Sequence, residues 1–279
     1  MPKAKPAPVT PAPWRVLTWN VNSIRLRGEG VKDVVGQYSP DVICLQETKV
    51  TDDLFPHELF DTLGYTHRVI RGQPGYNGVA IASRIPFAAD HRRVFCSKDD
   101  CRHIGVTLPG GVELHNFYIP AGGDIPDRTV NEKFGHKLDF VAEMTDWFSE
   151  RRQRDNRIVI VGDFNIAPLE HDVWSHKQLL KIVSHTPIEL EAIEKMRAAH
   201  DFVDGVRHFV PADQKLYSWW SYRNRDWKAS DRGRRLDHIW VTPALQDRLM
   251  AAEIYKPARD HTPPSDHVPV IVTLAPVVD

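Results

Sequence analysis

The chain has 279 residues, of which 42% are hydrophobic and 9% aromatic. This composition supports a sizeable core and excludes general disorder, and no apolar run approaches the roughly 18 residues that a membrane-spanning helix needs. The 36 basic and 37 acidic residues leave a formal net charge of −1, so whole-chain charge points to no particular partner. Three cysteines are too few for a disulfide scaffold.

Residues 1–13 contain five prolines, two lysines and no acidic residue. This composition predicts a flexible, extended tail. The tail lacks the apolar segment of a secretory signal, so we expect a cytoplasmic protein with no membrane partner. Residues 14–279 contain no internal repeat, no linker and no segment whose amino-acid composition differs from the rest, which predicts one domain.

Short runs rich in valine, isoleucine and aromatic residues predict strands. In chain order these runs are Arg15–Asn20, Asp41–Glu47, Gly78–Ser83, His103–Leu108, Val112–Tyr118, Arg157–Asn165, Leu236–Thr242 and Val268–Leu274. Apolar spacings of three and four residues predict a helix within Thr129–Glu150. Further helices are expected at Val31–Gln37, Glu189–Ala199 and Ala244–Ala251. Many strands with few helices between them indicate an α/β fold in which two stacked sheets carry helices on the outside.

Cys96, Cys101 and His103 are close enough in the sequence to suggest a zinc site. Zinc usually takes four ligands, and no fourth is evident nearby. We therefore favour free thiols in or near a strand.

Polar side chains of a few types recur where the predicted strands begin or end. They are Asn20 and Asn22, Glu47, Asn116 and Tyr118, Asp163 and Asn165, Asp237, and Asp266 with His267. Any one of them alone is compatible with a turn or a surface position. Carboxylates that meet at one rim repel each other unless a cation neutralises them, and carboxylate and amide oxygens suit Mg²⁺ or Mn²⁺. Together the strand ends predict a site for a hard divalent cation.

Eight segments carry a resemblance to a known family. They are Trp19-Asn20-Val21-Asn22-Ser23-Ile24-Arg25, Leu45-Gln46-Glu47-Thr48-Lys49, Gly78-Val79-Ala80, Tyr118-Ile119-Pro120, Gly162-Asp163-Phe164-Asn165, Tyr217-Ser218-Trp219-Trp220-Ser221-Tyr222-Arg223, Arg235-Leu236-Asp237 and Ser265-Asp266-His267. In this order and spacing, from about Trp14 to Leu274, they resemble the exonuclease III family of AP endonucleases, within the endonuclease/exonuclease/phosphatase superfamily.

The resemblance implies a four-layer α/β/β/α sandwich of two stacked mixed sheets flanked by helices. It implies Mg²⁺-dependent hydrolysis of duplex DNA on the 5′ side of an abasic site, with Mn²⁺ as a possible substitute. It also implies 3′→5′ exonuclease and 3′-phosphatase activity on blocked 3′ ends. A monomer in the bacterial cytoplasm or nucleoid is the corresponding expectation.

Site roles follow from the same resemblance. Glu47 would be the main metal ligand, with Asn20, Asn22 and Asp266 around it. Asp163, helped by Asn165, would lie near the metal and orient or deprotonate the attacking water. His267 would contact the scissile phosphate, oriented by Asp237, and Tyr118 would lie beside that phosphate. Whether one or two metals act, and which group is the base, stays open at this point.

The resemblance also implies a pocket for a flipped-out abasic sugar. Trp219 would form its wall and Trp220 would support it. Six basic residues follow within thirteen positions, and we expect them to grip the DNA backbone. Together with Trp219 and Trp220, the residues assigned to DNA binding are Arg223, Arg225, Lys228 and Arg232.

Three positions depart from the family pattern. Ala121 stands where many relatives carry an amide, Ser221 replaces an acidic residue, and Arg234 replaces an apolar or aromatic pocket residue. Two other functions were weighed. A superfamily relative that hydrolyses another phosphodiester or a phosphomonoester would share the acidic residues, and an inactive DNA-binding module would lack one of them.

Overall fold

Two six-stranded sheets form the centre of the molecule. The computed structural model describes residues 12–277 except 152, 154 and 225. The first sheet has the order β13-β14-β1-β2-β4-β3, formed by Leu249–Ile254, Val270–Leu274, Trp14–Asn20, Val42–Gln46, Val79–Ser83 and His67–Arg71. The second has the order β5-β6-β7-β8-β12-β9, formed by Asp90–His91, His103–Leu108, Val112–Tyr118, Ile158–Asp163, Asp237–Val241 and Val203–Asp204. Both sheets mix parallel and antiparallel pairs.

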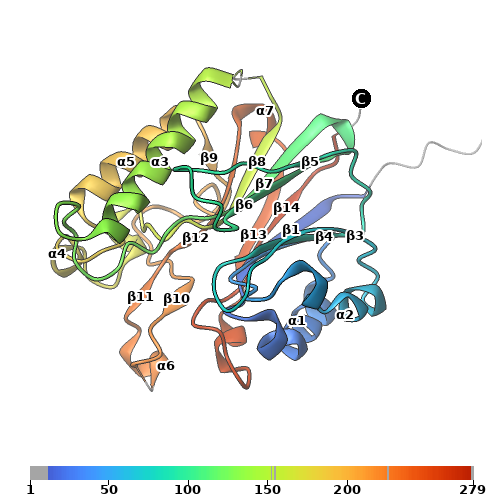
Figure 1. Cartoon of the computed structure of the whole chain (residues 1–279), viewed down its shortest axis with the longest axis horizontal. Coiled ribbons are helices and arrows are strands. Elements are labelled where there is room, and N and C mark those ends of the chain that lie inside the picture. The colour runs from blue at the N-terminus through green and yellow to red at the C-terminus, as the bar shows by residue number, and fades with distance from the viewer. Residues whose placement is uncertain (1–11, 152, 154, 225, 278–279) are drawn as a thin grey trace, which may run out of the picture.

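Helices cover the outer face of each sheet (Figure 1). Helices α1 (Ile24–Tyr38) and α2 (His57–Thr62) lie against the first sheet, and α3 (Glu132–Arg151) and α5 (Pro187–Ala198) against the second. The shorter helices are α4 (His176–Leu179), α6 (Trp227–Ser230) and α7 (Pro243–Gln246), with 3₁₀ turns at Asp52–Leu54, Pro109–Gly111, Glu170–Asp172 and Lys256–Asp260. The expected α/β/β/α layers are therefore confirmed. None of the helices in the described residues is long and apolar enough to cross a membrane.

Three apolar cores hold the layers together. Between the sheets, Val16 and Ile81 of the first sheet share a core with Ile104 and Val161 of the second. Two further cores join each sheet to its own helices. Burial of each such side chain contributes roughly 1.5–3 kcal/mol to the stability of the fold. The packed core therefore fixes the distance between the sheets and, with it, the rim where their strand ends meet.

Chain direction brings the expected polar residues to one rim. Strands β1 and β2 run parallel, as do β7 and β8, so each pair ends on one side. Strand β12 is antiparallel to β8, and its first residue Asp237 lies opposite Asp163. A small antiparallel hairpin, β10 (Trp219–Trp220) with β11 (Gly233–Arg234), stands beside this rim.

Several predicted boundaries were wrong. The helix expected at Ala244–Ala251 ends at Gln246, and Leu249 begins the edge strand β13. Antiparallel pairing with β14 over Leu249–Ile254 decides this, because it satisfies backbone N–H and C=O groups of both strands. Helix α1 begins seven residues before the expected Val31, in a stretch whose glycines weaken the helical pattern. Helix α5 begins at Pro187 rather than Glu189, because Thr186 and Glu189 form a capping box.

The predicted strands are all present, and the structure adds others that the sequence analysis did not single out: β3, β5, β9, β10, β11 and β13. The three cysteines are free, as expected. Among the described residues, the group of close metal-ligating side chains does not include Cys96, Cys101 or His103, so the zinc alternative has no support. The tail predicted at residues 1–13 falls mostly outside the described residues.

Candidate active site

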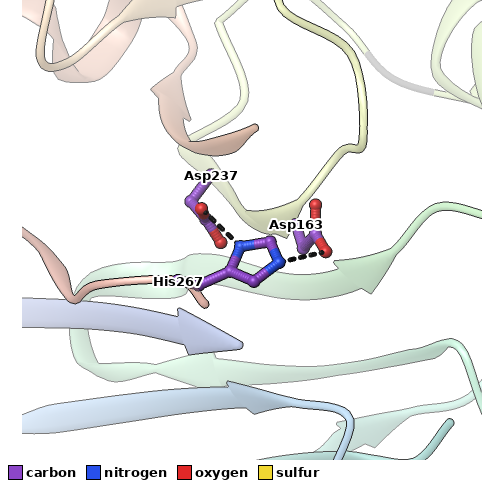
Figure 2. A group of neighbouring side chains, drawn as sticks. All are labelled: Asp163, Asp237 and His267. Atoms are coloured by element: carbon purple, nitrogen blue, oxygen red, sulfur yellow. Dashed lines mark hydrogen bonds and ion pairs between the residues drawn. The ribbon is translucent and has the colours of Figure 1, made fainter. Parts of the chain in front are cut away.

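His267 lies between two carboxylates at the rim (Figure 2). Its Nδ1 is 2.9 Å from Asp237 Oδ2, and its Nε2 is 3.7 Å from Asp163 Oδ2. All three side chains are buried. Burial alone would lower the pKa of His267, but the charges of Asp237 and Asp163 outweigh it and raise that pKa to about 10. The imidazole is therefore a cation at neutral pH.

Asp237 is held by the hairpin strand. Ser218 Oγ donates to Asp237 Oδ2 at 2.6 Å and accepts from the backbone N–H of Asp237 at 3.1 Å. With Nδ1–H of His267 also on Oδ2, this carboxylate fixes the ring and leaves Nε2 directed toward Asp163. Asp237 thus orients the imidazolium, as a carboxylate behind a reactive histidine does in other hydrolases.

Asp163 ends β8 inside a region of excess negative charge. Burial raises its pKa, and the charges of Asp237 and Glu47 add to that effect, although His267 opposes it. Gly162 precedes it with φ 137°, and a Cβ there would lie 1.9 Å from the carbonyl oxygen of Phe117 on β7. Only glycine lets β7 and β8 approach this closely beside the site.

Asn20 joins Asp163 to Glu47. Its Nδ2 donates to Asp163 Oδ2 and to Glu47 Oε1, each at 2.9 Å. Tyr118 OH donates to the same Glu47 oxygen at 2.8 Å, and Lys49 Nζ lies 2.8 Å from Glu47 Oε2. Burial would raise the pKa of Glu47, but its bonds to Asn20 and Lys49 lower it, so this carboxylate stays ionised. Burial, with the nearby negative charge of Glu47, raises the pKa of Tyr118, so its hydroxyl keeps its proton.

Asp266 adds a further carboxylate to the site. Asn22 Nδ2 donates to Asp266 Oδ1 at 3.1 Å, and Trp219 Nε1 donates to Asp266 Oδ2 at 2.9 Å. Asn165 completes the set, since its backbone N–H and side-chain amide both donate to Asp163, at 2.9 and 3.2 Å. The hydrogen bonds connect Asn20, Asn22, Glu47, Asp163 and Asn165, while Asp266 joins through Asn22.

Four residues at these strand ends have a left-handed backbone conformation. Asn22, Glu47, Lys49 and Asn165 have φ values of 44°, 51°, 55° and 53°. Such left-handed conformations are unfavourable for residues other than glycine, and they cluster at functional sites where surrounding structure holds them. Here they turn each chain sharply at the end of its strand, so that the polar side chain faces the rim.

These side chains line a cleft of about 560 Å³. Its wall includes Glu47, Tyr118, Asp163, Asp266 and His267. The cleft is also lined by Trp219 and by the three residues that depart from the family pattern, Ala121, Ser221 and Arg234. Among the residues assigned to DNA binding, Arg223 and Arg232 line the cleft as well.

The other predicted DNA contacts differ. Trp220 was expected to support the pocket; it has 0% exposure, with its ring near Tyr217 and Trp227, so it lies inside the molecule and does not line the cleft. Lys228 does not line the cleft, and its Nζ is 2.7 Å from Asp260 Oδ2. Arg225 lies outside the described residues.

Sequence reasoning missed a buried ion pair behind the site. Lys137 on α3 and Glu189 on α5 are both fully buried and bonded to each other. Lys137 Nζ also donates to the carbonyl oxygens of Asn165 at 2.7 Å and Ala121 at 3.3 Å. The pair thereby ties both outer helices to two turns that line the cleft. A signal was present, because Lys137 falls on the apolar face of the predicted helix, next to Leu138.

The donor set suits a hard cation, because carboxylate and amide side chains of Glu47, Asp163 and Asn20 converge within hydrogen-bonding distance and carry oxygen ligands. Asp163, Asp237 and His267 also place ligand atoms within 4.8 Å of one another, but the hydrogen bond between His267 and Asp237 fits an oriented imidazolium better. The site therefore combines an acidic cluster that could hold a metal with a buried imidazolium, and both can stabilise negative charge on a phosphate ester.

The comparisons agree with this class of site. Residues 17–267 match the endonuclease/exonuclease/phosphatase family, and the chain belongs to that family. It is 30% identical over 267 residues to exodeoxyribonuclease III of Haemophilus influenzae, covering 92% of this chain and 98% of that one.

Solved structures are similar throughout. An AP endonuclease from Archaeoglobus fulgidus matches with TM-score 0.86 and 31% identity, over 94% of this chain and 99% of that one. The 3′-5′ exonuclease NExo of Neisseria meningitidis matches with TM-score 0.84 and 30% identity, over 93% and 99%. NExo is also described as a 3′ phosphatase and has been solved bound to a product DNA hairpin.

Proposed function

We propose that this protein is a Mg²⁺-dependent DNA-repair nuclease. It hydrolyses the phosphodiester 5′ to an abasic site in duplex DNA, and it removes nucleotides and blocking groups from 3′ ends. The observation that carries the proposal is the meeting of Glu47, Asp163 and His267 at one cleft wall, with Asp237 buried behind His267 and bonded to it. The relatives support the substrate class, because they are an exodeoxyribonuclease III, an AP endonuclease and a 3′ phosphatase.

The metal would be held at the acidic end of the cleft. Its candidate ligands are Glu47, Asn20, Asn22, Asp266, Asp163 and Asn165, and Mn²⁺ would be able to replace Mg²⁺. The bound ion would supply charge neutralisation and Lewis acidity at the phosphoryl group. Lys49 Nζ contacts Glu47 Oε2 and Asn22 Oδ1. It therefore keeps these two candidate metal ligands in place when no cation is bound.

His267 would donate a hydrogen bond from Nε2 to an oxygen of the scissile phosphate. Its raised pKa keeps it protonated at neutral pH, and Asp237 prevents the ring from turning away. Such a fixed donor stabilises charge that develops on the phosphate in the transition state. Tyr118, whose hydroxyl keeps its proton, would lie beside the same phosphate.

Asp163 would orient or deprotonate the attacking water. Asn165 and Asn20 hold its carboxylate from two sides, so an in-line position for the water can be maintained. A pKa raised toward neutrality suits a group that accepts a proton during turnover. A bound divalent cation would shift the same pKa downward and favour the ionised form.

DNA would lie across the cleft mouth. Arg223 and Arg232 would contact backbone phosphates, and Trp219 would form one wall of the pocket for the flipped-out sugar. We further propose that the protein acts as a monomer, because one chain supplies all these side chains. In a bacterial cell its substrate would place it with the DNA in the cytoplasm.

A duplex with one abasic site tests the proposal. With Mg²⁺ we expect a nick that leaves a 3′-hydroxyl on the 5′ side of the abasic residue, and with EDTA we expect none. Asp163→Asn and His267→Ala should each lose at least about a hundredfold in kcat, with DNA binding retained. Cleavage that persists in EDTA, or activity confined to another class of phosphate ester, would refute the proposal.

A further inference from the structure

Arg234 lies in line with the catalytic histidine. Its backbone pairs with Trp219 across the β10–β11 hairpin, and Trp219 in turn forms a β-bridge with His267. Residues opposite each other in antiparallel strands present their side chains on the same face. The three side chains therefore form a row along one wall. The backbone of Arg234 lies two strand spacings, or about 10 Å, from that of His267.

The guanidinium of Arg234 is held from two sides. Its Nη1 donates to the carbonyl oxygen of Val183 at 2.9 Å and to Ser184 Oγ at 2.8 Å. Its central carbon lies 5.2 Å from the centroid of the Trp219 ring. These contacts fix the plane of the group while the residue still lines the cleft, so its remaining donors keep a defined direction.

Those donors lack an acidic partner. Among the hydrogen bonds and ion pairs of the described residues, none involves Nη2 or Nε of Arg234, and Nε is buried. Burial lowers the pKa of Arg234, and Glu189 opposes this only from a distance, since its carboxylate is bonded to Lys137. Arginine nevertheless stays charged in proteins. A full positive charge thus sits partly buried in the cleft wall without a carboxylate.

The neighbouring arginines show the contrast. Arg235 is fully buried, but Asp172 and Asp204 neutralise it. Arg232 is exposed to water and lies over the ring of Trp174, with its central carbon 4.8 Å from the centroid. Only Arg234 of these three combines partial burial with no counter-charge. A desolvated charge of this kind is costly unless an anion reaches it.

We propose that Arg234 binds a second anionic group of the substrate, attached next to the phosphate that reacts at His267. The inference rests on the proposed function. A guanidinium matches an oxyanion because two parallel N–H donors can reach two oxygens. The anion has two sources with the same chemistry: the neighbouring phosphate of a continuous strand, or an acidic remnant on a damaged 3′ end. In both cases Arg234 adds a charged contact for an anion next to the sugar that enters this pocket.

Matched substrate pairs test this binding. One pair is a 3′ end that carries phosphoglycolate or its neutral analogue, a phosphate esterified with ethylene glycol. The other is a duplex with an internal tetrahydrofuran abasic analogue whose next phosphate, on the side away from the scissile bond, is either normal or a neutral methylphosphonate. For Arg234→Met we expect kcat/KM to fall at least about tenfold on the charged member of one pair. The neutral member of that pair should change less than twofold, and the affected pair identifies the source of the anion.

Arg232→Met is the matched control, because it removes the same charge from the same cleft. It should weaken binding of the charged and neutral members alike. Melting temperatures report any damage to the Val183–Ser184 segment. If Arg234→Met does not fold, Arg234→Lys replaces it, since lysine keeps the charge without the paired donors and should still lose several-fold on the charged member alone.

Two outcomes are decisive. The proposal would be overturned if the Arg234 variant lost kcat/KM equally on the charged and neutral members of both pairs, or if it lost none on any substrate. The nuclease function would stand in either case. A wild-type protein that cleaves none of the four substrates with Mg²⁺ would instead refute the proposed function, and this inference with it.

Discussion

Replacing Lys137 by methionine should destabilise the fold and slow catalysis together. Methionine has a similar length and fills the same space, so the change mainly removes the charge and three hydrogen bonds. Glu189 would then remain as a buried carboxylate with only neutral donors, from Ser184 and Thr186. Breaking one side of a buried ion pair costs about 3–5 kcal/mol. For a chain of this size such a cost lowers Tm by roughly 10 °C.

The catalytic effect follows from the second function of this lysine. Its Nζ holds the carbonyl oxygens of Asn165 and Ala121, so without it the turn that carries Asn165 is less well fixed beside Asp163. Displacements of this kind reduce rates by up to about a hundredfold. We expect a lower kcat at 20 °C, well below the transition, with a smaller change in KM.

Urea denaturation of four proteins measures the coupling. The set is the wild type, Lys137→Met, Glu189→Gln and the double variant. Because the cost arises from an unpaired charge, the double variant should be more stable than the sum of the single effects predicts, by about 1–3 kcal/mol. A Lys137→Met protein within 1 kcal/mol of wild type, or strictly additive effects, would refute the reasoning.

The remaining predictions concern the site and the core. Glu47→Gln should raise the Mg²⁺ concentration for half-maximal cleavage, and an unchanged Mg²⁺ titration would contradict its role as a ligand. Asp163→Asn should abolish turnover but not DNA binding, measured by single-turnover cleavage beside a gel shift. Trp219→Ala should slow abasic-site cleavage without changing the slope of log K against log salt; equal loss on intact DNA with a much lower Tm would indicate a packing role instead. Burial lowers the pKa of His238 to about 4, whereas the unfolded chain has about 6.5. The unfolded state therefore binds more protons in that window, so stability should fall as pH drops from 6.5 to 4, by up to about 3 kcal/mol. Urea midpoints for His238→Gln should fall less steeply over the same pH range.

Much of the site was predictable because strand ends carry a clear local signal. Glu47 and Asp163 stand where a β-rich run ends, and His267 stands just before one begins, so each polar group lies where strand pairing stops. Sheets bring such ends to one rim. The structure brings these residues together within hydrogen-bonding or ion-pairing range, as the sequence analysis expected. Local periodicity also predicted the layered fold and the long helix α3.

Tertiary structure decided which way each side chain points and which acidic residue pairs with each basic one. Trp219 and Trp220 are adjacent and chemically identical, yet only the first lines the cleft, because successive side chains of a strand point to opposite sides. Lys228 and Arg232 looked alike in a basic run, but Asp260, distant in sequence, pairs with the first alone.

The sequence by itself therefore determined which chemical groups stand at the strand ends, and with them the class of fold and reaction. Only the tertiary structure decided how their charges are balanced. Asp172 and Asp204 neutralise Arg235, while Arg234 next to it has no carboxylate partner among the residues that the structure describes. The physical reason is that a charge is stabilised by whatever lies within a few ångströms in space, and residues far apart along the chain supply those neighbours.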